Sequence, residues 1–524
     1  MAVTPDSEIR LLKCNLNLDN TNQLNFATKT AQYNYFNSLT KLVQNGCTYQ
    51  RKDNYIRWPA HIDSIIEYNY VMYKNTHYND KWFYAYITRM EYENDNCTKI
   101  YIKTDVFQTW QFDLTYMPSF IEREHVNDDT FGKHTIPEDL ETGEYISCDL
   151  QPSFSNLGDM VYVVGLTEIY TSLGSYTRTN STIPVGLYYY GFTELQGAEK
   201  LISDLDGAGK GDAINCIFVA PKSFFSDWND VSGYGGKVST HSNYNYTATL
   251  NITHVNYLGK NYTPKNNKLL CYPYSYLQVS NSSGQVINYY WELFHLVNLE
   301  ETNYQFYING TLTPSCSIKA YPLNYKNMIQ DFDDSITFGK LPIGAYTNDT
   351  YINWLTQNGV NIGVNLVSAT TQVIGGALMM TTGAGSVAGA GSIAAGATNI
   401  AQTLGSVYQH SLIPDSVSGN VNCGDVNYVM GLSDLMFKRI SIKNEYAKII
   451  DDYFSMYGYK VNTVKTPNIT GRSNWNFVKM INPNIEAYIP QEDLQEIKSM
   501  FSAGLTIWHT TQYFLDYSRT NSII

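Results

Sequence analysis

Two neighbouring stretches near the N-terminus alternate between faces with a period of two residues. In residues 82–92, Trp82 and Tyr84 fall on one face and Phe83 falls on the other. Both faces are partly apolar, so the pattern predicts a strand that packs on two sides. Residues 100–110 are also rich in β-branched and aromatic side chains, and turn-prone residues separate the two stretches. Together they predict a β-hairpin.

Helical spacing of apolar residues appears in two stretches near the C-terminus, within residues 444–460 and 493–501. Gly458 ends the first pattern and Gly504 follows the second, as is common at the C-terminal ends of helices. A strand is expected over residues 505–510. The apolar positions are Tyr446, Ile449, Ile450, Tyr453, Phe454 and Tyr457 in the first helix and Leu494, Ile497, Met500 and Phe501 in the second.

Turn-forming residues interrupt the middle of the chain. Between about residues 128 and 340, they cluster at 128–133, 206–212 and 232–237, which predicts a β-rich inserted domain with exposed loops. Residues 32–42 favour neither helix nor strand. The chain has 524 residues, and single hydrophobic cores stop growing near roughly 250 to 300 residues, so two or three modules are expected. With 45 Tyr residues and 16% charged residues, the predicted fold class is mainly β with a few helices.

Residues 350–414 contain no Asp, Glu, Lys or Arg, although a membrane-spanning helix needs only about 20 apolar residues. Small residues at helical spacing allow helices to approach closely in lipid, and two pairs occur here, Gly359 with Gly363 and Gly385 with Gly389. A flexible linker is one alternative and a permanent transmembrane helix is another. The large apolar side chains argue against the linker, and the Gly, Asn, Gln and Thr content argues against the permanent helix. We therefore expect a segment that inserts conditionally, through Val364, Leu366, Val367, Val373, Ile374, Leu378, Met379, Met380, Val387, Ile393, Ile400 and Leu404.

Charge and chemistry narrow the function. A net charge of −13 argues against tight nucleic-acid binding, which requires clustered Lys and Arg. The eight cysteines contain no CxxC pair and are expected to be free and mostly buried. Residues 206–212 resemble the end of a phosphate-binding loop, but Asp204 and Gly211 replace its first Gly and its Ser or Thr, so a surface turn is favoured. We expect no catalytic residues, no cofactor and no metal. The N-terminus does not have the pattern of a secretory signal.

Six stretches in the same order resemble the distal tail knob proteins of small Picovirinae-type podoviruses, bacteriophages with a short noncontractile tail. They cover the first 126 residues and about the last 80, and residues 127–348 show no such match. The stretches are AQYNYFNS (31–38), KWFYAYITRMEYEN (81–94), DVFQTWQF (105–112), SFIEREHV (119–126), YFSMYGYKVNTVKTPN (453–468) and DLQEIKSMFSAGLTIWHT (493–510).

The resemblance implies a homohexameric tube at the tail tip of the virion, with proximal tail and collar proteins as further partners. It divides the chain into four parts. The N-terminal part of the tube module is 1–126, the inserted β-rich knob is 127–349, the hydrophobic loop is 350–414, and the C-terminal part of the tube module is 415–524. The two tube parts would combine into β-barrel modules.

The resemblance also implies that the loop first plugs the tube and then forms a channel through the lipids of the host cytoplasmic membrane during genome ejection. Six copies at −13 each carry −78, which predicts an acidic lumen through which genomic DNA passes without specific binding.

Two other functions remain open. In one, exposed aromatic loops of residues 127–340 bind cell-wall polysaccharide as an adhesin, and the uncharged segment is only a plug. In the other, a carboxylate pair such as Glu122 with Glu124 or Asp333 with Asp334 hydrolyses peptidoglycan. For these carboxylates, ordinary solvated charges are the preferred interpretation.

Overall fold

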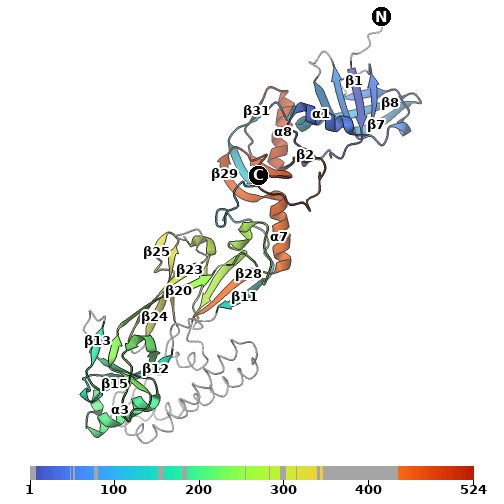
Figure 1. Ribbon diagram of the computed structural model, residues 1–524. Coiled ribbons are helices and arrows are strands. Elements are labelled where there is room, and N and C mark those ends of the chain that lie inside the picture. Colours follow the sequence, from blue (N-terminus) through green and yellow to red (C-terminus); the bar gives the residue numbers. More distant parts are fainter. Residues whose placement is uncertain are drawn as a thin grey trace, which may run out of the picture. The chain divides into compact units, whose positions relative to one another are not determined.

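The computed structural model describes residues 7–345 and 435–524, apart from 48, 51–53, 76–80, 152–158, 180–185, 254, 282–283, 295–302, 314–315 and 339–342. The chain divides into two compact units. The terminal unit comprises Met1–Thr142, Pro264–Leu269 and Glu445–Ile524, and the inserted unit comprises Gly143–Thr263 and Leu270–Asn444. Both chain ends therefore belong to one unit (Figure 1). The assignment of tube and knob roles to four parts of the chain stays a prediction.

A seven-stranded sheet forms the N-terminal part of the terminal unit, with the order β3-β1-β6-β7-β8-β5-β4. The predicted hairpin is confirmed, because β7 and β8 pair antiparallel. The 3₁₀ helix Ile62–Ser64 also lies in this part of the chain. The strands are β1 (Ser7–Leu12), β3 (Lys41–Asn45), β4 (Tyr49–Gln50), β5 (Tyr55–Trp58), β6 (Tyr70–Asn75), β7 (Trp82–Asn94) and β8 (Cys97–Thr104).

Two short helices accompany this sheet, and the sequence patterns did not specify either of them. The prediction of strand through residue 110 is wrong, because α2 (Val106–Trp110) follows β8. The Asp105 carboxylate accepts the Gln108 N–H and so caps the first turn of α2. The undecided residues 32–42 mostly form α1 (Lys29–Ser38), which lies beside the sheet in Figure 1. Phe36 is the one apolar side chain that α1 buries, so the helical pattern is weak.

A five-stranded sheet combines strands from both chain ends in the order β2-β32-β30-β10-β29. Both predicted C-terminal helices are confirmed as α7 (Asn444–Tyr457) and α8 (Gln491–Ala503). One expected core position is wrong, because Ile449 is 67% exposed and α7 buries the face with Ala447, Ile450 and Phe454. The strands are β2 (Asn22–Leu24), β10 (Ser119–Glu124), β29 (Tyr459–Lys465), β30 (Trp475–Ile481) and β32 (Leu505–Trp508), and a separate pair joins β9 (Leu114–Tyr116) to β31 (Ile485–Ala487).

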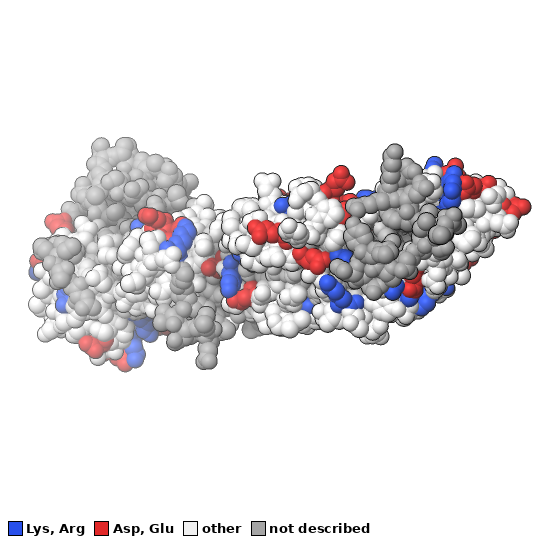
Figure 2. All heavy atoms as spheres, turned by 90° about the horizontal axis from the view of Figure 1, so that it is seen from above, with Lys and Arg blue, Asp and Glu red and all other residues white. Residues whose placement is uncertain are grey.

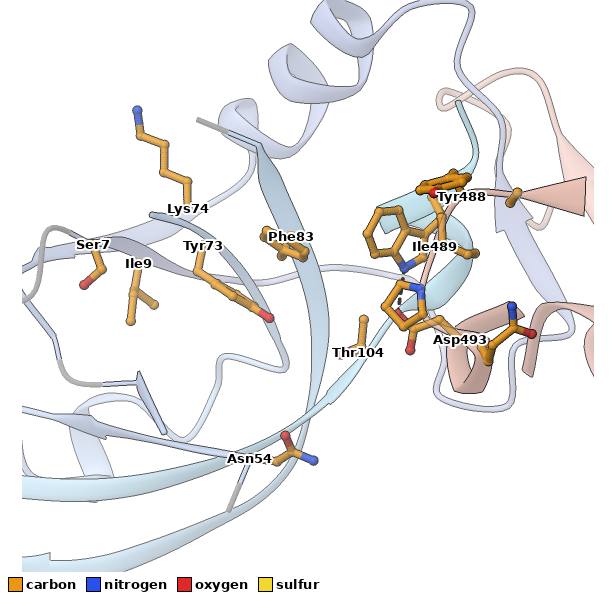
Figure 3. Close-up of a pocket in the computed structure, with 14 residues that line it drawn as sticks. Ser7, Ile9, Asn54, Tyr73, Lys74, Phe83, Thr104, Tyr488, Ile489 and Asp493 are labelled. Atoms are coloured by element: carbon orange, nitrogen blue, oxygen red, sulfur yellow. Dashed lines mark hydrogen bonds between the residues drawn. The ribbon is translucent and has the colours of Figure 1, made fainter. Parts of the chain in front are cut away.

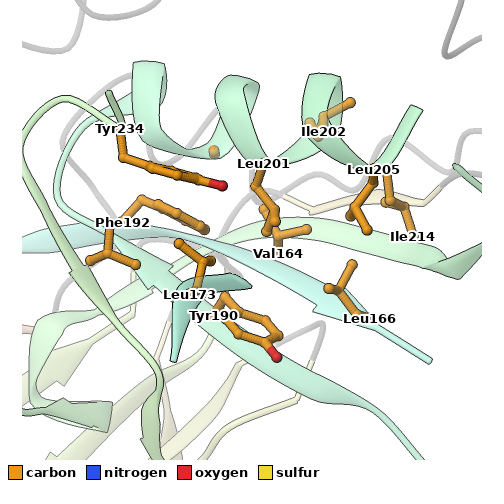
Figure 4. Packing of buried hydrophobic residues seen from close by; sticks show 12 residues of the cluster. Val164, Leu166, Leu173, Tyr190, Phe192, Leu201, Ile202, Leu205, Ile214 and Tyr234 are labelled. Atoms are coloured by element: carbon orange, nitrogen blue, oxygen red, sulfur yellow. The ribbon is translucent and has the colours of Figure 1, made fainter. Parts of the chain in front are cut away.

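The inserted unit is β-rich, and its helix α3 (Leu195–Gly207) packs on a six-stranded sheet. Leu201 and Leu205 point from α3 toward Val164 and Leu166 of β12, and all four side chains are buried (Figure 4). In the order of pairing, the strands are β17 (Asn229–Asp230), β18 (Lys237–Ser239), β14 (Tyr188–Phe192), β12 (Met160–Leu166), β15 (Ile214–Pro221) and β27 (Ile343–Ala345).

Three further sheets complete the described part of the inserted unit. The first comprises β11 (Tyr145–Gln151), β28 (Met436–Ile442), β21 (Ser275–Ser280) and β22 (Val286–Tyr289). The second comprises β20 (Asn245–Thr253), β23 (Asn303–Thr311), β24 (Ser317–Tyr325), β25 (Met328–Gln330) and β26 (Ile336–Thr337). The third comprises β13 (Thr177–Thr179), β19 (His241–Asn243) and β16 (Phe225–Ser226). Short 3₁₀ helices of this unit are Thr171–Leu173, Gly211–Ala213, Lys222–Phe224 and Trp291–Leu293, and the 3₁₀ helix Asn267–Leu270 belongs mostly to the terminal unit.

The phosphate-loop-like residues 206–212 form a surface turn, as preferred from the sequence. They begin in the last turn of α3, and Gly209 adopts φ +70°, which favours glycine. Lys210 is half exposed and pairs with Glu168 at 2.8 Å, so its ammonium group is engaged by a neighbouring carboxylate. The seven cysteines in the described ranges are free thiols, and five are buried, as predicted. Cys423 lies outside those ranges.

Candidate functional site

The predicted membrane segment, residues 350–414, lies outside the described residues. This holds for the predicted insertion residues from Val364 to Leu404 and for the packing glycines from Gly359 to Gly389. Within the ranges that the structure describes, no helix is long and apolar enough to cross a bilayer. The structure does describe the strands that precede and follow the segment, β27 and β28, and both belong to the inserted unit.

The strand that precedes the uncharged segment, β27, is an edge strand. β27 pairs antiparallel with β15, with Ile343 opposite Phe218 and Ala345 opposite Cys216, and it is the last strand of the six-stranded sheet. Three register pairs hold it there. An edge strand of this length is fixed by few backbone hydrogen bonds, so this end of the segment has the weaker attachment.

The chain returns through a central strand. β28 pairs antiparallel with β11 on one side and β21 on the other, so both of its backbone edges are engaged. Leu435, just before the strand, is fully buried. Phe437 is buried and packs edge-on against Phe306, with ring centroids 5.5 Å apart. This end of the segment is therefore anchored in the core of the inserted unit.

A buried arginine adds to this anchor. The Arg439 guanidinium donates to the backbone carbonyls of Tyr257 and Gly259, at 2.5 and 2.7 Å, and it lies 4.5 Å from the centroid of the Tyr257 ring. The Gly259 N–H donates in turn to the Ser441 hydroxyl at 3.0 Å. Charge-assisted hydrogen bonds in a buried setting are stronger than neutral ones. The loop around Tyr257 is thus fastened to β28 at Arg439 and at Ser441.

The terminal unit contains a cavity of about 880 Å³. Ile9 and Tyr73 line it from the seven-stranded sheet, and Tyr488 and Ile489 line it from the loop before α8 (Figure 3). Its one carboxylate, that of Asp493, accepts the Trp110 indole N–H at 2.8 Å. Neither this cavity nor any other described part of the chain groups three or more His, Cys, Asp or Glu residues in a way that could hold a metal ion.

The suspected carboxylate pair on β10 consists of two separately engaged groups. Glu122 pairs with Lys479 at 2.9 Å. Glu124 is fully buried, pairs with Lys465 and accepts the Asn468 N–H at 3.0 Å. The interpretation of Glu124 as a solvated charge is therefore wrong, because the loop around Asn468 covers it. These partners give both groups a structural role in joining the two chain ends.

Residues 333–334 form the other suspected pair. Asp334 is part of a turn in which its own N–H and that of Asp333 donate to the Asp331 carboxylate, at 3.2 and 3.1 Å. The Asp334 carboxylate pairs with Lys326. This arrangement explains the acidic run as turn chemistry.

A buried ionic cluster in the terminal unit was not predicted. Glu138 pairs with Arg123 and with Lys268 and accepts the Lys460 N–H at 2.9 Å. Glu138 and Lys268 are buried, and Lys268 lies in Pro264–Leu269, which is an excursion of the chain from the inserted unit. The cluster fastens this excursion to the terminal unit. Glu138 and Lys268 are 130 residues apart in the sequence, so no local sequence pattern could reveal their contact.

Charges of both signs are mixed on the face of the molecule that Figure 2 shows. On the face shown in Figure 2, acidic and basic side chains are interspersed among uncharged residues, and the coloured basic residues form no broad patch. On this face, the described residues therefore do not form the clustered cations that bind phosphates tightly.

Comparisons with known proteins agree with the architecture. The family model for the C-terminal domain of the Bacillus phage phi29 tail knob protein gp9 matches residues 237–522, and the model for the caudoviral major tail protein N-terminus matches residues 5–115. The tail knob protein gp9 of Bacillus phage B103 is 25% identical, with 95% of each chain covered. Those of Bacillus phages PZA and phi29 are 24% and 23% identical, with 93% of each chain covered.

A solved structure shares the fold. The bacteriophage C1 tail knob protein, gp12, superimposes with a TM-score of 0.65 at 15% sequence identity, over 99% of this chain and 100% of that chain. The phi29 family model alone spans more than half of the 524 residues. The chain therefore belongs to the tail knob protein gp9 family, the structural proteins of the distal tail of phage virions.

Proposed function

We propose that the chain assembles as a homohexamer that forms a tube and knob, in which the uncharged segment closes the DNA channel. On infection, this segment inserts into the host cytoplasmic membrane and forms a pore for genome ejection. One observation carries the proposal. A stretch of roughly 65 residues without a charged side chain, long enough for more than one span, connects two paired strands of a single compact unit.

Composition supports a change of environment for this segment. Side chains such as Leu378 and Val387 are costly to expose to water, and contiguous apolar surface of this extent normally has protein or lipid cover. The spacings Gly359 to Gly363 and Gly385 to Gly389 favour close helix packing in lipid. If the segment has a comparable free energy under protein cover and in lipid, it has two states, and contact with a membrane shifts it toward the inserted state.

The anchors support the same mechanism. The return strand β28 is a central strand with a buried Arg439, so the segment can leave its cover while its C-terminal end stays fixed. The acidic chain suits a lumen through which DNA slides without adhering, since like charges do not form the contacts that would hold it. Proximal tail and collar proteins would hold the other end of the tube.

Dye release from liposomes tests the pore. The full-length protein is added to vesicles filled with a self-quenching dye, over a range of pH. Leu378→Asp and Val387→Asp should each abolish release, because a charge at the centre of a span costs about 3 kcal/mol. Ile329→Asp is the matched control, since Ile329 is 81% exposed in the inserted unit and should leave release unchanged. Intact vesicles with the wild-type protein at every pH would contradict the proposal.

A second candidate function is adhesion to wall polysaccharide, favoured by a tyrosine cluster on the inserted unit. Tyr272 is 44% exposed, and its ring packs at a tilt against that of Tyr290 with centroids 4.2 Å apart. The centroid of the Tyr276 ring lies 5.9 Å from that of Tyr272. Exposed aromatic faces bind sugar rings through apolar contact. A protein lacking residues 350–414 that still binds host walls, and loses this binding with Tyr272→Ala, would establish adhesion independently of the pore.

A further inference from the structure

Three exposed apolar side chains lie side by side on one face of the five-stranded sheet. Phe120 of β10 is directly opposite Val464 of β29 and directly opposite Ile481 of β30. Their exposed fractions are 37%, 67% and 47%. Because β10 lies between the other two strands, the three side chains form one continuous row across the sheet, which is called the apolar row below.

The two faces of this sheet differ in how they are covered. On the other face, Ile121 and Met480 are buried, and they pack in one cluster with Ile497 and Phe501 of α8. No described element covers the apolar row to a similar extent. A sheet with one solvated face normally presents polar side chains there, so three neighbouring apolar residues mark a contact surface.

A polar groove of about 620 Å³ adjoins the row and is lined from the same strands and from the end of α7. Its charged side chains occur in pairs of opposite sign. Glu122 lies 2.9 Å from Lys479, and Asp139 lies 2.8 Å from Lys460. The groove therefore carries little net charge, although the chain as a whole carries −13. Two copies of an acidic chain repel each other least where their charges are already balanced.

We propose that the apolar row and the adjoining groove form the surface through which one copy of the chain contacts a second copy. This inference rests on the proposed homohexamer and names the surface by which neighbours meet. A closed ring requires two different surfaces on each copy, so the apolar row meets another part of its neighbour.

The arrangement favours a second copy over other occupants. A bilayer with anionic lipids would select a surface with excess Lys and Arg, whereas this surface has balanced charges. Extension of the sheet along β29 is disfavoured, because the edge strand carries Lys460 and Lys465 and the Glu138 carboxylate accepts the Lys460 N–H. A second copy therefore makes contact through the exposed face of the sheet.

Assembly of the full-length protein tests the inference. Val464→Asp should raise the concentration at which half of the chains are assembled by at least about tenfold, because it places a carboxylate in an apolar contact. Sedimentation or native mass spectrometry measures this concentration. The matched control is Ile66→Asp, since Ile66 is an exposed residue of the same unit away from the row. Far-UV circular dichroism and thermal melting verify that both variants fold.

A photoreactive benzoylphenylalanine at position 464 gives a second measurement that does not depend on destabilisation. Cross-links to peptides of another copy support the inference. The inference is overturned if the wild type assembles and Val464→Asp assembles equally well, or if the probe captures only lipids from added vesicles. Neither of these results would contradict the proposed hexamer. A wild type that stays monomeric at every concentration overturns the hexamer together with this surface.

Discussion

A buried histidine makes the terminal unit sensitive to acid. The Nδ1 atom of His125 accepts the Phe477 N–H at 2.8 Å, and its Nε2 atom lies 3.2 Å from the Ser455 carbonyl oxygen, to which it donates. The ring is thus held in its neutral form. Burial, reinforced by the positive charges of Arg472 and Arg123, lowers the pKa of His125 from 6.5 to about 3.

The sign of the effect follows from this shift. In the unfolded chain, His125 binds a proton near pH 6.5, whereas in the folded chain it does so only near pH 3. Stability from the neutral ring is therefore present above pH 6.5 and is lost as the pH falls toward 3. The full loss is about 5 kcal/mol and is reached below pH 3, and about 2 kcal/mol of it is already lost at pH 5.

The substitution His125→Asn isolates this contribution. The Asn carbonyl oxygen can accept the Phe477 N–H in place of Nδ1, but it does not titrate. Hydrogen exchange of the full-length protein, followed by mass spectrometry on peptides covering β30, compares wild type and variant at pH 7.5 and at pH 5. The protection of wild type relative to variant should fall by roughly 30-fold between the two pH values, which corresponds to about 2 kcal/mol.

Because wild type and variant are compared at the same pH, the contributions of other titrating groups cancel in the protection ratio. Asp105 is one of these groups in the same unit, since burial raises its pKa to about 6 and gives it the opposite pH dependence. The partly exposed His61, whose side chain is 43% exposed, offers a control, and His61→Asn should leave the ratio constant. A ratio for His125→Asn that is the same at pH 5 and pH 7.5 would refute the reasoning.

Three further predictions concern the stability of the two units. Gly458→Ala should destabilise the terminal unit by about 2 kcal/mol or more, since Gly458 has φ +66° and an added Cβ would lie 2.1 Å from a backbone carbonyl oxygen. The matched variant Gly207→Ala, where an added Cβ meets open space, should be neutral or stabilising by up to about 1 kcal/mol. Thermal melting measures both. Glu138→Gln should cost about 3 kcal/mol and speed hydrogen exchange in residues 264–269, because two buried cations lose their carboxylate, and unchanged exchange there would contradict this role. In urea unfolding, Asp105→Asn should raise the free energy of unfolding by about 1–2 kcal/mol at pH 7.5 but not at pH 4. The reason is that the protonated form of Asp105 stabilises the fold at low pH, and this contribution is lost as the pH rises through its pKa of about 6. A variant less stable than the wild type at pH 7.5 would contradict this prediction.

Local periodicity predicted the elements whose shape depends on neighbouring residues. The β7–β8 hairpin and the helices α7 and α8 were found because their apolar residues repeat at periods of two and 3.6 and their ends carry turn residues or glycine. The helix α2 was missed for a different reason. Its residues favour a strand by composition, and the Asp105 cap together with burial decides for a helix.

Long-range contacts explain what the sequence could not reveal. Arg439 meets carbonyl groups about 180 residues away, and Glu138 meets Lys268 across 130 residues. In the sequence, these are isolated charges indistinguishable from solvated ones. The apolar row was equally hidden, because Phe120, Val464 and Ile481 become neighbours only once β10 joins two strands from the other end of the chain.

The two proposed activities depend on different compact units, which makes them separable. The apolar row belongs to the terminal unit, whereas both strands that flank the uncharged segment belong to the inserted unit. A fold in which one unit provides the contacts between copies can hold a bistable segment in the other without weakening those contacts, because the free energy of each depends on a distinct hydrophobic core. In the proposed mechanism β28 makes this possible, since the buried side chains of Leu435, just before the strand, and of Phe437, within it, would keep the inserted unit intact while the uncharged segment changes its environment. Loss of assembly without loss of membrane activity at high concentration, and the reverse, are therefore both attainable by single substitutions.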